Sequence, residues 1–234
     1  MMDYKTEHYI FHCVNNKIAE NDIEIIAKTQ EEAYEAITKT LNVKYETIIN
    51  YYLVNTPEEV TKLTQYPYPV NGLACFSNKS IYAVYNDEIK CIGPHEDAHL
   101  ISETFGMSDL DFLCEGLAMH FDKCWWEIDN YLWCKYYMDE GVFPNIIKLL
   151  NNQGFNKIDC SLSYPVAGAF TSYLIEKFGI EKYRCFYINN FNSTIISNQE
   201  LEIIINGFID KIKHIDMNDI EKARIKVIYE SNII

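Results

Sequence analysis

The stretch PHEDAHLISETFGMSDLDFLCEGLAMHFD, residues 94–122, decides most of what can be expected of this 234-residue chain. It opens with His95, Glu96 and His99 in the pattern His-Glu-x-x-His. Residues four apart on a helix project from nearly the same face, so the two imidazoles can take neighbouring corners of one tetrahedral zinc site. Glu96, one step along the helix, can then reach a water at the metal. Pro94 favours a helix that begins there.

A catalytic zinc site needs a third protein ligand, and Glu115 is the best candidate for it. Gly106 predicts the end of the first helix, and Ser108 with Asp111 three residues later predicts the start of a second. His99 lies about six residues, roughly 9 Å, before this turn, and Glu115 lies about as far after it. A tight reversal would therefore return Glu115 to the height of His99.

These residues resemble the gluzincin group of zinc metallopeptidases, in which the third metal ligand is a glutamate on a second helix. HEDAH followed by CEGLAMHF carries the resemblance, and SYPVAGAFTSYLIEKFGIEKYRCFY at 163–187 is similar to a tyrosine-containing helix of many of these enzymes. The resemblance implies a thermolysin-like core fold and hydrolysis of peptide bonds. It also implies that His95, His99 and Glu115 are zinc ligands, that Glu96 is general base and then general acid, and that Tyr164 stabilises the oxyanion.

Two positions depart from the patterns of this group. Aminopeptidases have a Gly-x-Met-Glu-Asn edge strand upstream of the first histidine, and GLACF, residues 72–76, stands at the matching place. Cys75 replaces the glutamate that binds the substrate amine, which favours an endopeptidase or a specialised peptidase. Thermolysin-like members have an aspartate four residues after the third ligand, and this chain has Met119 there. Another group must then orient the histidine, or the zinc is held less tightly.

Hydrophobic periodicity predicts an α+β fold, with an N-terminal mixed sheet and helices followed by a mainly helical C-terminal half. The resemblance to the gluzincins implies that this fold is zincin-like. Residues 7–14 and 46–54 are typical of strands, residues 20–41 of a helix, and Thr56 followed by Pro57 of a capped helix start. The runs 73–76 and 81–85 predict a hairpin at the edge of the sheet. Further helices are expected near residues 94–105, 109–122, 128–139, 144–152, 165–178, 181–190 and 199–213.

The pattern and the resemblance together lead us to expect a single zincin-like catalytic domain over residues 1–234. An α/β part would cover residues 1–93 and a helical part residues 94–234, with the active site at their junction. A chain of this length with 48% apolar residues can bury a full core without disulfides.

Composition and charge exclude several function classes. The net charge is −14, from 34 acidic and 20 basic side chains, and only Arg184 and Arg224 are arginines, so a nucleic-acid partner is not expected. The longest uncharged stretch, residues 160–175, is too short and too polar to span a bilayer, so no membrane partner is expected. The expected partner is a peptide or protein substrate, and the oligomeric state stays open.

The cysteines and the N-terminal residues predict the compartment. Eight cysteines are spread along the chain without a close pair, which excludes a local Cys-x-x-Cys zinc site and is typical of buried thiols in a reducing compartment. The residues MMDYKTEHYI lack the basic region and apolar run of a secretory signal. We therefore expect a cytoplasmic protein.

Several alternatives remain open at this point. Tyr164 is one of 18 tyrosines and can equally pack in the core with its hydroxyl hydrogen-bonded there. Asp97 is expected to be a solvated helix charge, and His120, five residues after Glu115, is expected to turn away from the ligand face. The chain could also be a non-catalytic peptide-binding or regulatory module, or a zincin hydrolase of another amide. Glu96 favours the peptidase, since a binding module needs no base beside the metal.

Overall fold

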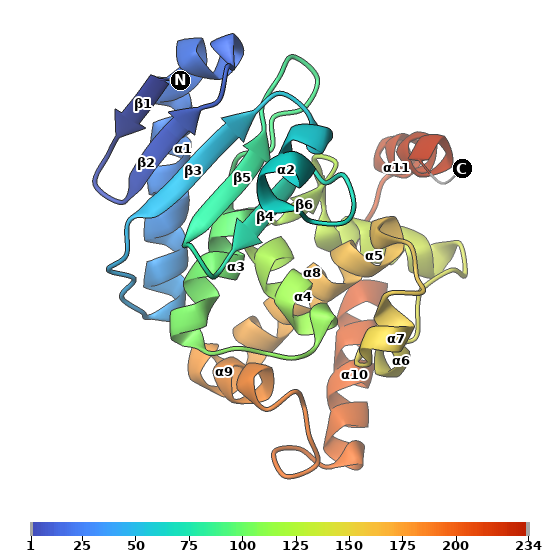
Figure 1. The fold of residues 1–234 in the computed structure, drawn as a ribbon. Helices are drawn as coiled ribbons and strands as arrows, with labels where there is room; N and C mark the ends of the chain where they lie inside the picture. Colours follow the sequence, from blue (N-terminus) through green and yellow to red (C-terminus); the bar gives the residue numbers. More distant parts are fainter. Residues whose placement is uncertain (1, 233–234) are drawn as a thin grey trace. The chain divides into compact units, whose positions relative to one another are not determined.

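The computed structural model describes residues 2–232 and divides into two compact units, Met1–Phe105 and Gly106–Ile234. The first unit contains a five-stranded mixed sheet in the order β1-β2-β3-β5-β4 (Figure 1). Its strands are β1 (Met2–Lys5), β2 (Tyr9–Cys13), β3 (Ile49–Val54), β4 (Gly72–Cys75) and β5 (Ser80–Val84). The second unit is mainly helical. The predicted α+β class, with its N-terminal mixed sheet, is confirmed.

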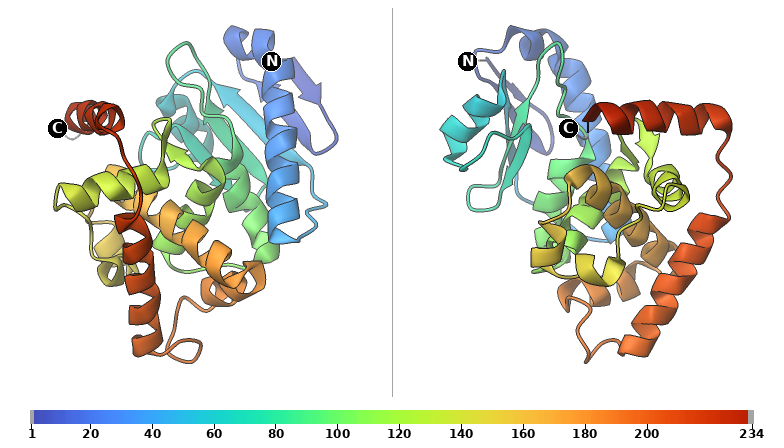
Figure 2. Two further views of the ribbon diagram at one scale, coloured as in Figure 1. Left: turned by 180° about the vertical axis from the view of Figure 1, so that it is seen from behind. Right: turned by 90° about the vertical axis from the view of Figure 1, so that its right-hand side faces the viewer.

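The sheet of the first unit is covered on both faces. Strands β2, β3 and β5 are parallel, while β1 and β4 pair antiparallel at the two edges. Helices α1 (Lys17–Leu41) and α3 (Pro94–Phe105) pack against each other, α1 also against β2 and α3 against β4. Helix α2 (Pro57–Thr64) lies on the other face, against β3, β4 and β5, and Figures 1 and 2 show α1 and α2 on opposite sides of the sheet.

Asn16 explains how the beginning of α1 is held to the sheet. Its side-chain oxygen caps α1 by accepting a hydrogen bond from Ala19 N at 2.9 Å. Its side-chain nitrogen donates to the carbonyls of Val54 at 3.0 Å and Tyr85 at 2.7 Å, just where β3 and β5 end. The side chain is fully buried, and these bonds satisfy its amide.

In the second unit, α8 is the central helix. It packs against α4, α5 and α9, and α10 packs against α5 (Figure 2). The elements in chain order are α4 (Asp111–Asp122), β6 (Cys124–Trp125), β7 (Ile128–Asp129), α5 (Asn130–Asp139), α6 (Ile146–Leu149), α7 (Asn152–Phe155), α8 (Cys160–Phe178), α9 (Ile180–Ile188), α10 (Asn198–Lys213) and α11 (Asp219–Asn232).

Helix α8 begins at Cys160, earlier than the predicted start at 165, because the chain tolerates a proline inside the helix. Pro165 has no N–H to donate to the carbonyl of Ser161, one turn before it. The hydroxyl of Tyr137 donates to that carbonyl instead. Asp159 caps the helix by accepting from Ser161 N at 2.8 Å. Tyr164 therefore lies within α8.

Other elements also differ from the predictions. The helix expected over 144–152 is broken into α6 and α7, because Asn151 caps a new helix and accepts from Gly154 N. The edge strand β1, the short β6–β7 pair and α11 were not predicted. The expected capped start of α2 is confirmed, since Thr56 accepts from Glu59 N at 3.4 Å.

None of the helices in the described part of the chain combines the length with the apolar composition that a membrane crossing requires. The expectation of buried thiols is correct for Cys13 and Cys134. It is wrong for Cys124 and Cys160, which are exposed.

Candidate metal centre

Helix α3 carries both histidines of the motif, within the range predicted from the sequence. Pro94 is its first residue, and Glu96 and Asp97 lie in its first turn, where carboxylates interact favourably with the helix dipole. His95, Glu96 and His99 are partly exposed, whereas Leu100, Ile101 and Phe105 are buried. The motif thus occupies the more exposed side of an amphipathic helix.

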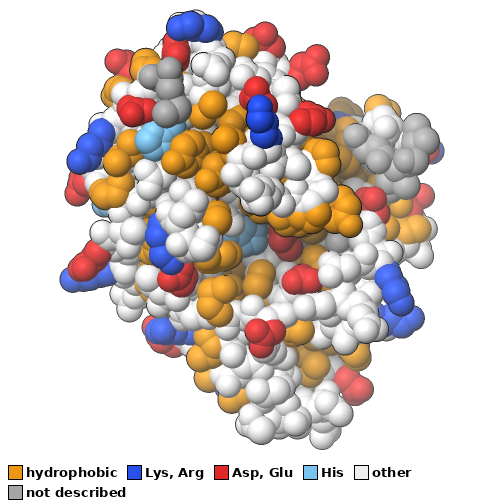
Figure 3. All heavy atoms as spheres, viewed as in Figure 1, with side chains coloured by type: hydrophobic (Ala, Val, Ile, Leu, Met, Phe, Trp, Pro, Cys, Tyr) orange, Lys and Arg blue, Asp and Glu red, His pale blue; other side chains and the backbone are white. Residues whose placement is uncertain are grey.

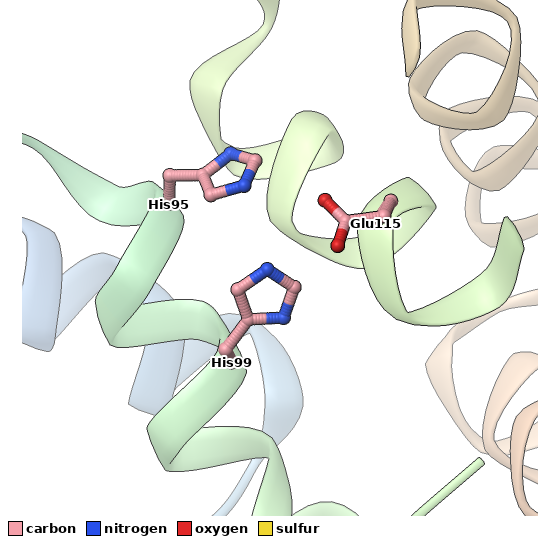
Figure 4. A group of neighbouring side chains, drawn as sticks. All are labelled: His95, His99 and Glu115. Carbon is pink, nitrogen blue, oxygen red and sulfur yellow. The ribbon is translucent and has the colours of Figure 1, made fainter. Parts of the chain in front are cut away.

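His95, His99 and Glu115 form a group that could hold a metal ion. Each offers one ligand atom, and these atoms all lie within 4.8 Å of one another. In Figure 4 the two imidazoles project from one helix and the carboxylate of Glu115 points toward them. Two imidazole nitrogens and one carboxylate oxygen match the donor set of many catalytic zinc sites.

Two glycines explain how α4, which carries Glu115, packs so closely on α8. A side chain at Gly116 would come within 2.9 Å of the Ala167 carbonyl oxygen, and one at Gly168 within 2.7 Å of Met119 Cβ. Larger residues would push the helices apart, so the Gly after Glu115 fixes the position of this turn. Met119 is fully buried. Where thermolysin-like enzymes have an aspartate, this chain therefore has a packing residue between two helices.

The turn before α4 is built differently from the sequence prediction. Gly106 has a φ of 134°, as expected of a helix terminator, but α4 starts at Asp111 with Leu110 as its N-cap. The predicted cap Ser108 lies two residues too early. Its hydroxyl donates to Asn190 Oδ1 at 2.7 Å and accepts from Leu110 N at 3.2 Å. The prediction of Ser108 as the cap was wrong because Asn190, distant in sequence, holds Ser108 and Asp109 N in the loop before the helix, so that α4 begins two residues later than a Ser108 cap requires.

Asp97 is not the solvated helix charge that the sequence predicted. It is fully buried between α3 and the sheet, and Tyr9 of β2 donates its hydroxyl to Asp97 Oδ1. Gln30 of α1 donates to Asp97 Oδ2 at 2.6 Å. Burial raises the pKa of Asp97 to about 8, although the hydrogen bond from Tyr9 opposes this rise. Neither Gln30 nor Tyr9 was identified from the sequence.

The edge strand β4 lies directly against Glu96. A side chain added to Gly72 would come within 2.5 Å of Glu96 Oε1 and 2.8 Å of Cys91 Sγ. The absence of a side chain at Gly72 leaves the space that the carboxylate of Glu96 occupies. Cys75, at the end of the same strand, is partly exposed, with its sulfur 3.3 Å from the hydroxyl oxygen of Ser77.

Tyr164 is packed among aromatic rings of its own unit. Its ring centroid lies 5.9 Å from that of Phe155 in a stacked pair and 5.6 Å from that of Trp125 in an edge-to-face pair. The ring is partly exposed. His120 is engaged elsewhere, since its Nδ1 lies 2.8 Å from the hydroxyl of Ser172 on α8. Burial lowers the pKa of His120 to about 4.

Comparison with known proteins assigns no family to the chain. No protein-family model matches it, and no curated protein matches it.

Proposed function

We propose that the protein is a zinc-dependent metallopeptidase, a hydrolase in which His95, His99 and Glu115 hold the metal. The grouping of these three donors within 4.8 Å of one another carries the proposal. They come from the two sequence motifs that resemble the gluzincins. A zinc ion held by three protein ligands keeps an open position, where it lowers the pKa of a water toward about 7 and polarises a carbonyl.

Glu96 is the proposed general base and then general acid. It follows His95 directly on α3 and shares the exposed side of the helix with both histidines. Its carboxylate takes a proton from the attacking water and later delivers it to the leaving amine. Tyr164 is the proposed hydrogen-bond donor to the oxyanion, a contribution on the order of 3 kcal/mol for such a donor. Its partly exposed ring on α8 is compatible with this role.

The edge strand β4 supports a peptide as the substrate. The bond from Val84 N to Asn71 O sets the alternation of the antiparallel ladder, so the backbone groups of Gly72 and Ala74 point away from β5. An extended peptide can add to such an edge as a further strand. Because Gly72 lies against Glu96, a peptide paired there would pass close to the proposed base.

Apolar side chains are exposed near this edge. Figure 3 shows them gathered over the region of α2 and β4, and the exposed ones in this part of the chain are Leu63, Tyr66, Tyr68 and Phe76. They favour peptides with apolar side chains, since exposed apolar patches mark binding surfaces. The cysteine spacing supports the cytoplasm as the proposed location.

The experiment that tests this function compares the wild type with Glu96→Gln. Both proteins should contain zinc by elemental analysis, because Glu96 is not a ligand. Cleavage of a mixed peptide library should be lost from Glu96→Gln, by about 100- to 10,000-fold in turnover, because the amide is a poor proton acceptor. Glu103→Gln is the matched control. It makes the same chemical change on α3 at an exposed glutamate paired with Lys79, and should cleave like the wild type.

Equal cleavage by zinc-loaded wild type and Glu96→Gln would overturn the mechanism. If neither cleaves any peptide although both bind zinc and peptide, the chain is the non-catalytic binding module instead.

A further inference from the structure

A single glutamine of α1 contacts both ends of the segment that carries His95 and Glu96. Gln30 Oε1 accepts a hydrogen bond from Gly93 N at 2.7 Å, and Gln30 Nε2 donates to Gly93 O at 3.0 Å. The same nitrogen donates to Asp97 Oδ2 at 2.6 Å. The amide thus makes two hydrogen bonds with the backbone of Gly93, as a neighbouring strand would, and a third with Asp97 in the first turn of α3.

The opposite side of Asp97 is held by the sheet. Tyr9 donates to Asp97 Oδ1, and its oxygen also lies 3.1 Å from the backbone carbonyl of Gln30. Gln30, Asp97 and Tyr9 are all fully buried. A closed polar network in a core specifies one arrangement of its members, because any shift would leave a buried polar group without a partner.

We propose that Gln30 is the positioning residue of the metal-binding turn, fixing His95 and Glu96 by holding Gly93 before them and Asp97 after them. This inference rests on the proposed function for what the turn does, but not for how the turn is held. Because Gly93 and Asp97 are both bonded to Gln30, the backbone between them is fixed relative to α1. The side chain of Gln30 bonds to Gly93 and Asp97, which flank His95 and Glu96, so it acts through the backbone of this segment.

A positioning residue has a large effect because a metal site tolerates only small displacements of its ligands and its base. Ligands and bases work only when they are held within about 0.5 Å of their productive positions. Misplacement of a catalytic group by about 1 Å can lower turnover by about 100-fold. A residue that only filled space between α1 and α3 would need no amide, since an apolar side chain of similar length would pack there without hydrogen-bond requirements.

The test uses two variants of Gln30 in the full chain. Gln30→Met keeps the length of the side chain and removes all three bonds. Gln30→Glu keeps the shape and the acceptor for Gly93 N, but loses the donor to Gly93 O and Asp97. Adding Asp97→Asn to Gln30→Glu restores a donor and acceptor between positions 30 and 97, but not the bond to Gly93 O.

Tyr34→Phe is the matched control. Tyr34 lies one turn along α1 from Gln30, is buried, and donates its hydroxyl to the carbonyl of Tyr45 in the following loop. Its loss removes a buried hydrogen bond of α1 that does not reach α3. It should lower the melting temperature without changing the metal-binding turn.

Three measurements separate positioning from general stability. Hydrogen exchange of residues 93–99 should become about 10-fold faster in Gln30→Met and Gln30→Glu, with little change in β2 and β3. The dissociation constant for zinc should rise by roughly 10- to 100-fold, as for other residues that orient metal ligands. The kcat should fall more than KM changes. The pair Gln30→Glu with Asp97→Asn should recover part of each effect.

The positioning role would be overturned if residues 93–99 exchanged at the wild-type rate in both Gln30 variants. It would also be overturned if the exchange rate rose equally throughout the first unit. An effect of Tyr34→Phe on that segment as large as that of the Gln30 variants would overturn it as well. Hydrogen exchange also separates this inference from the proposed function. If no peptide is cleaved, or no zinc is bound, while exchange rises only in residues 93–99, the peptidase proposal falls and the positioning role of Gln30 stands.

Discussion

Gly72 and Glu96 face each other so closely that a methyl group at Gly72 would lie 2.5 Å from Glu96 Oε1. Real Cβ atoms do not approach other heavy atoms so closely, so one of the two residues would have to move. The end of a glutamate side chain moves more easily than a strand that is paired to β5. The bare backbone of Gly72 is therefore a condition for the position of the proposed base.

Gly72→Ala should lower turnover by roughly 10- to 100-fold, because Glu96 is displaced from its place near the proposed metal site. The thermal stability should change little, since only side-chain ends, Glu96 Oε1 and Cys91 Sγ, have to shift. Zinc content should equal that of the wild type. Steady-state kinetics and a melting curve provide the check, and wild-type turnover would contradict the prediction.

Cys91→Ala serves as the control for this experiment. The thiol of Cys91 is the second atom that a methyl at Gly72 would meet, at 2.8 Å. Adding Cys91→Ala to Gly72→Ala should not restore turnover, because the carboxylate of Glu96 still has no room. Full restoration would assign the loss to the thiol.

The candidate site could be predicted because its information is local. The i, i+4 spacing of His95 and His99 and the glycine at 106 together predict two helices joined by a turn. The place of Glu115 in the second helix follows from the same stretch. No long-range contact is needed to choose these residues, and the structure groups the three side chains.

The surroundings of the site could not be predicted because they depend on contacts between distant parts of the chain. Asp97 looks like a helix charge until Gln30 and Tyr9, 67 and 88 residues away, are seen to surround it. One feature of the sequence does indicate a buried partner for Gln30. It stands in line with the apolar stripe of α1, between the buried residues Ala27 and Ala33, where a polar side chain needs a buried partner. Similarly, the early start of α8 depends on the hydroxyl of Tyr137, which replaces the missing donor of Pro165.

Removal of either kind of metal ligand should weaken zinc binding to a similar extent. His99→Ala and Glu115→Ala each remove one of the three proposed donors, so the dissociation constant for zinc should rise by more than ~100-fold, above the effect of losing a residue that only orients a ligand. Asp111→Asn is the control. Asp111 lies on α4, as Glu115 does, and its carboxylate accepts a hydrogen bond from Asn156, so this variant should bind zinc normally. Competition with a chromophoric chelator measures all four proteins. Normal zinc affinity of Glu115→Ala, with loss in His99→Ala, would move the third ligand elsewhere.

Acid should destabilise the protein partly through His120. Burial lowers its pKa in the folded protein to about 4, whereas an unfolded chain has a histidine pKa of about 6.5. Between these values the unfolded state binds the proton and the folded state does not, so the free energy of unfolding falls as pH decreases from about 6.5 to about 4. At pH 5 the contribution is about 2 kcal/mol at most.

The check for His120 is a comparison with His120→Asn, which keeps a polar group near Ser172 but does not titrate. Urea unfolding at pH 7.5 and pH 5 should show a larger loss of stability in the wild type than in the variant. Parallel losses in the two proteins would mean that His120 does not contribute to the pH dependence.

The protein should cut peptides at internal bonds and should not require a free N-terminus. In the aminopeptidase pattern, a glutamate of the edge strand binds the free amine of the substrate, and Cys75 occupies that place on β4. A thiol beside Ser77 offers no negative charge to an ammonium group. Peptides with an acetylated N-terminus should therefore be cleaved at internal bonds with kcat/KM within about fivefold of the free peptides, since an exposed ion pair is worth no more than ~1 kcal/mol. Mass spectrometry of the products distinguishes the outcomes.

Cys75→Glu provides the matched comparison, because it restores the carboxylate and should shift preference toward peptides with a free amine. Exclusive removal of single N-terminal residues by the wild type would show that another group of this chain binds the amine, and the endopeptidase assignment would then be wrong.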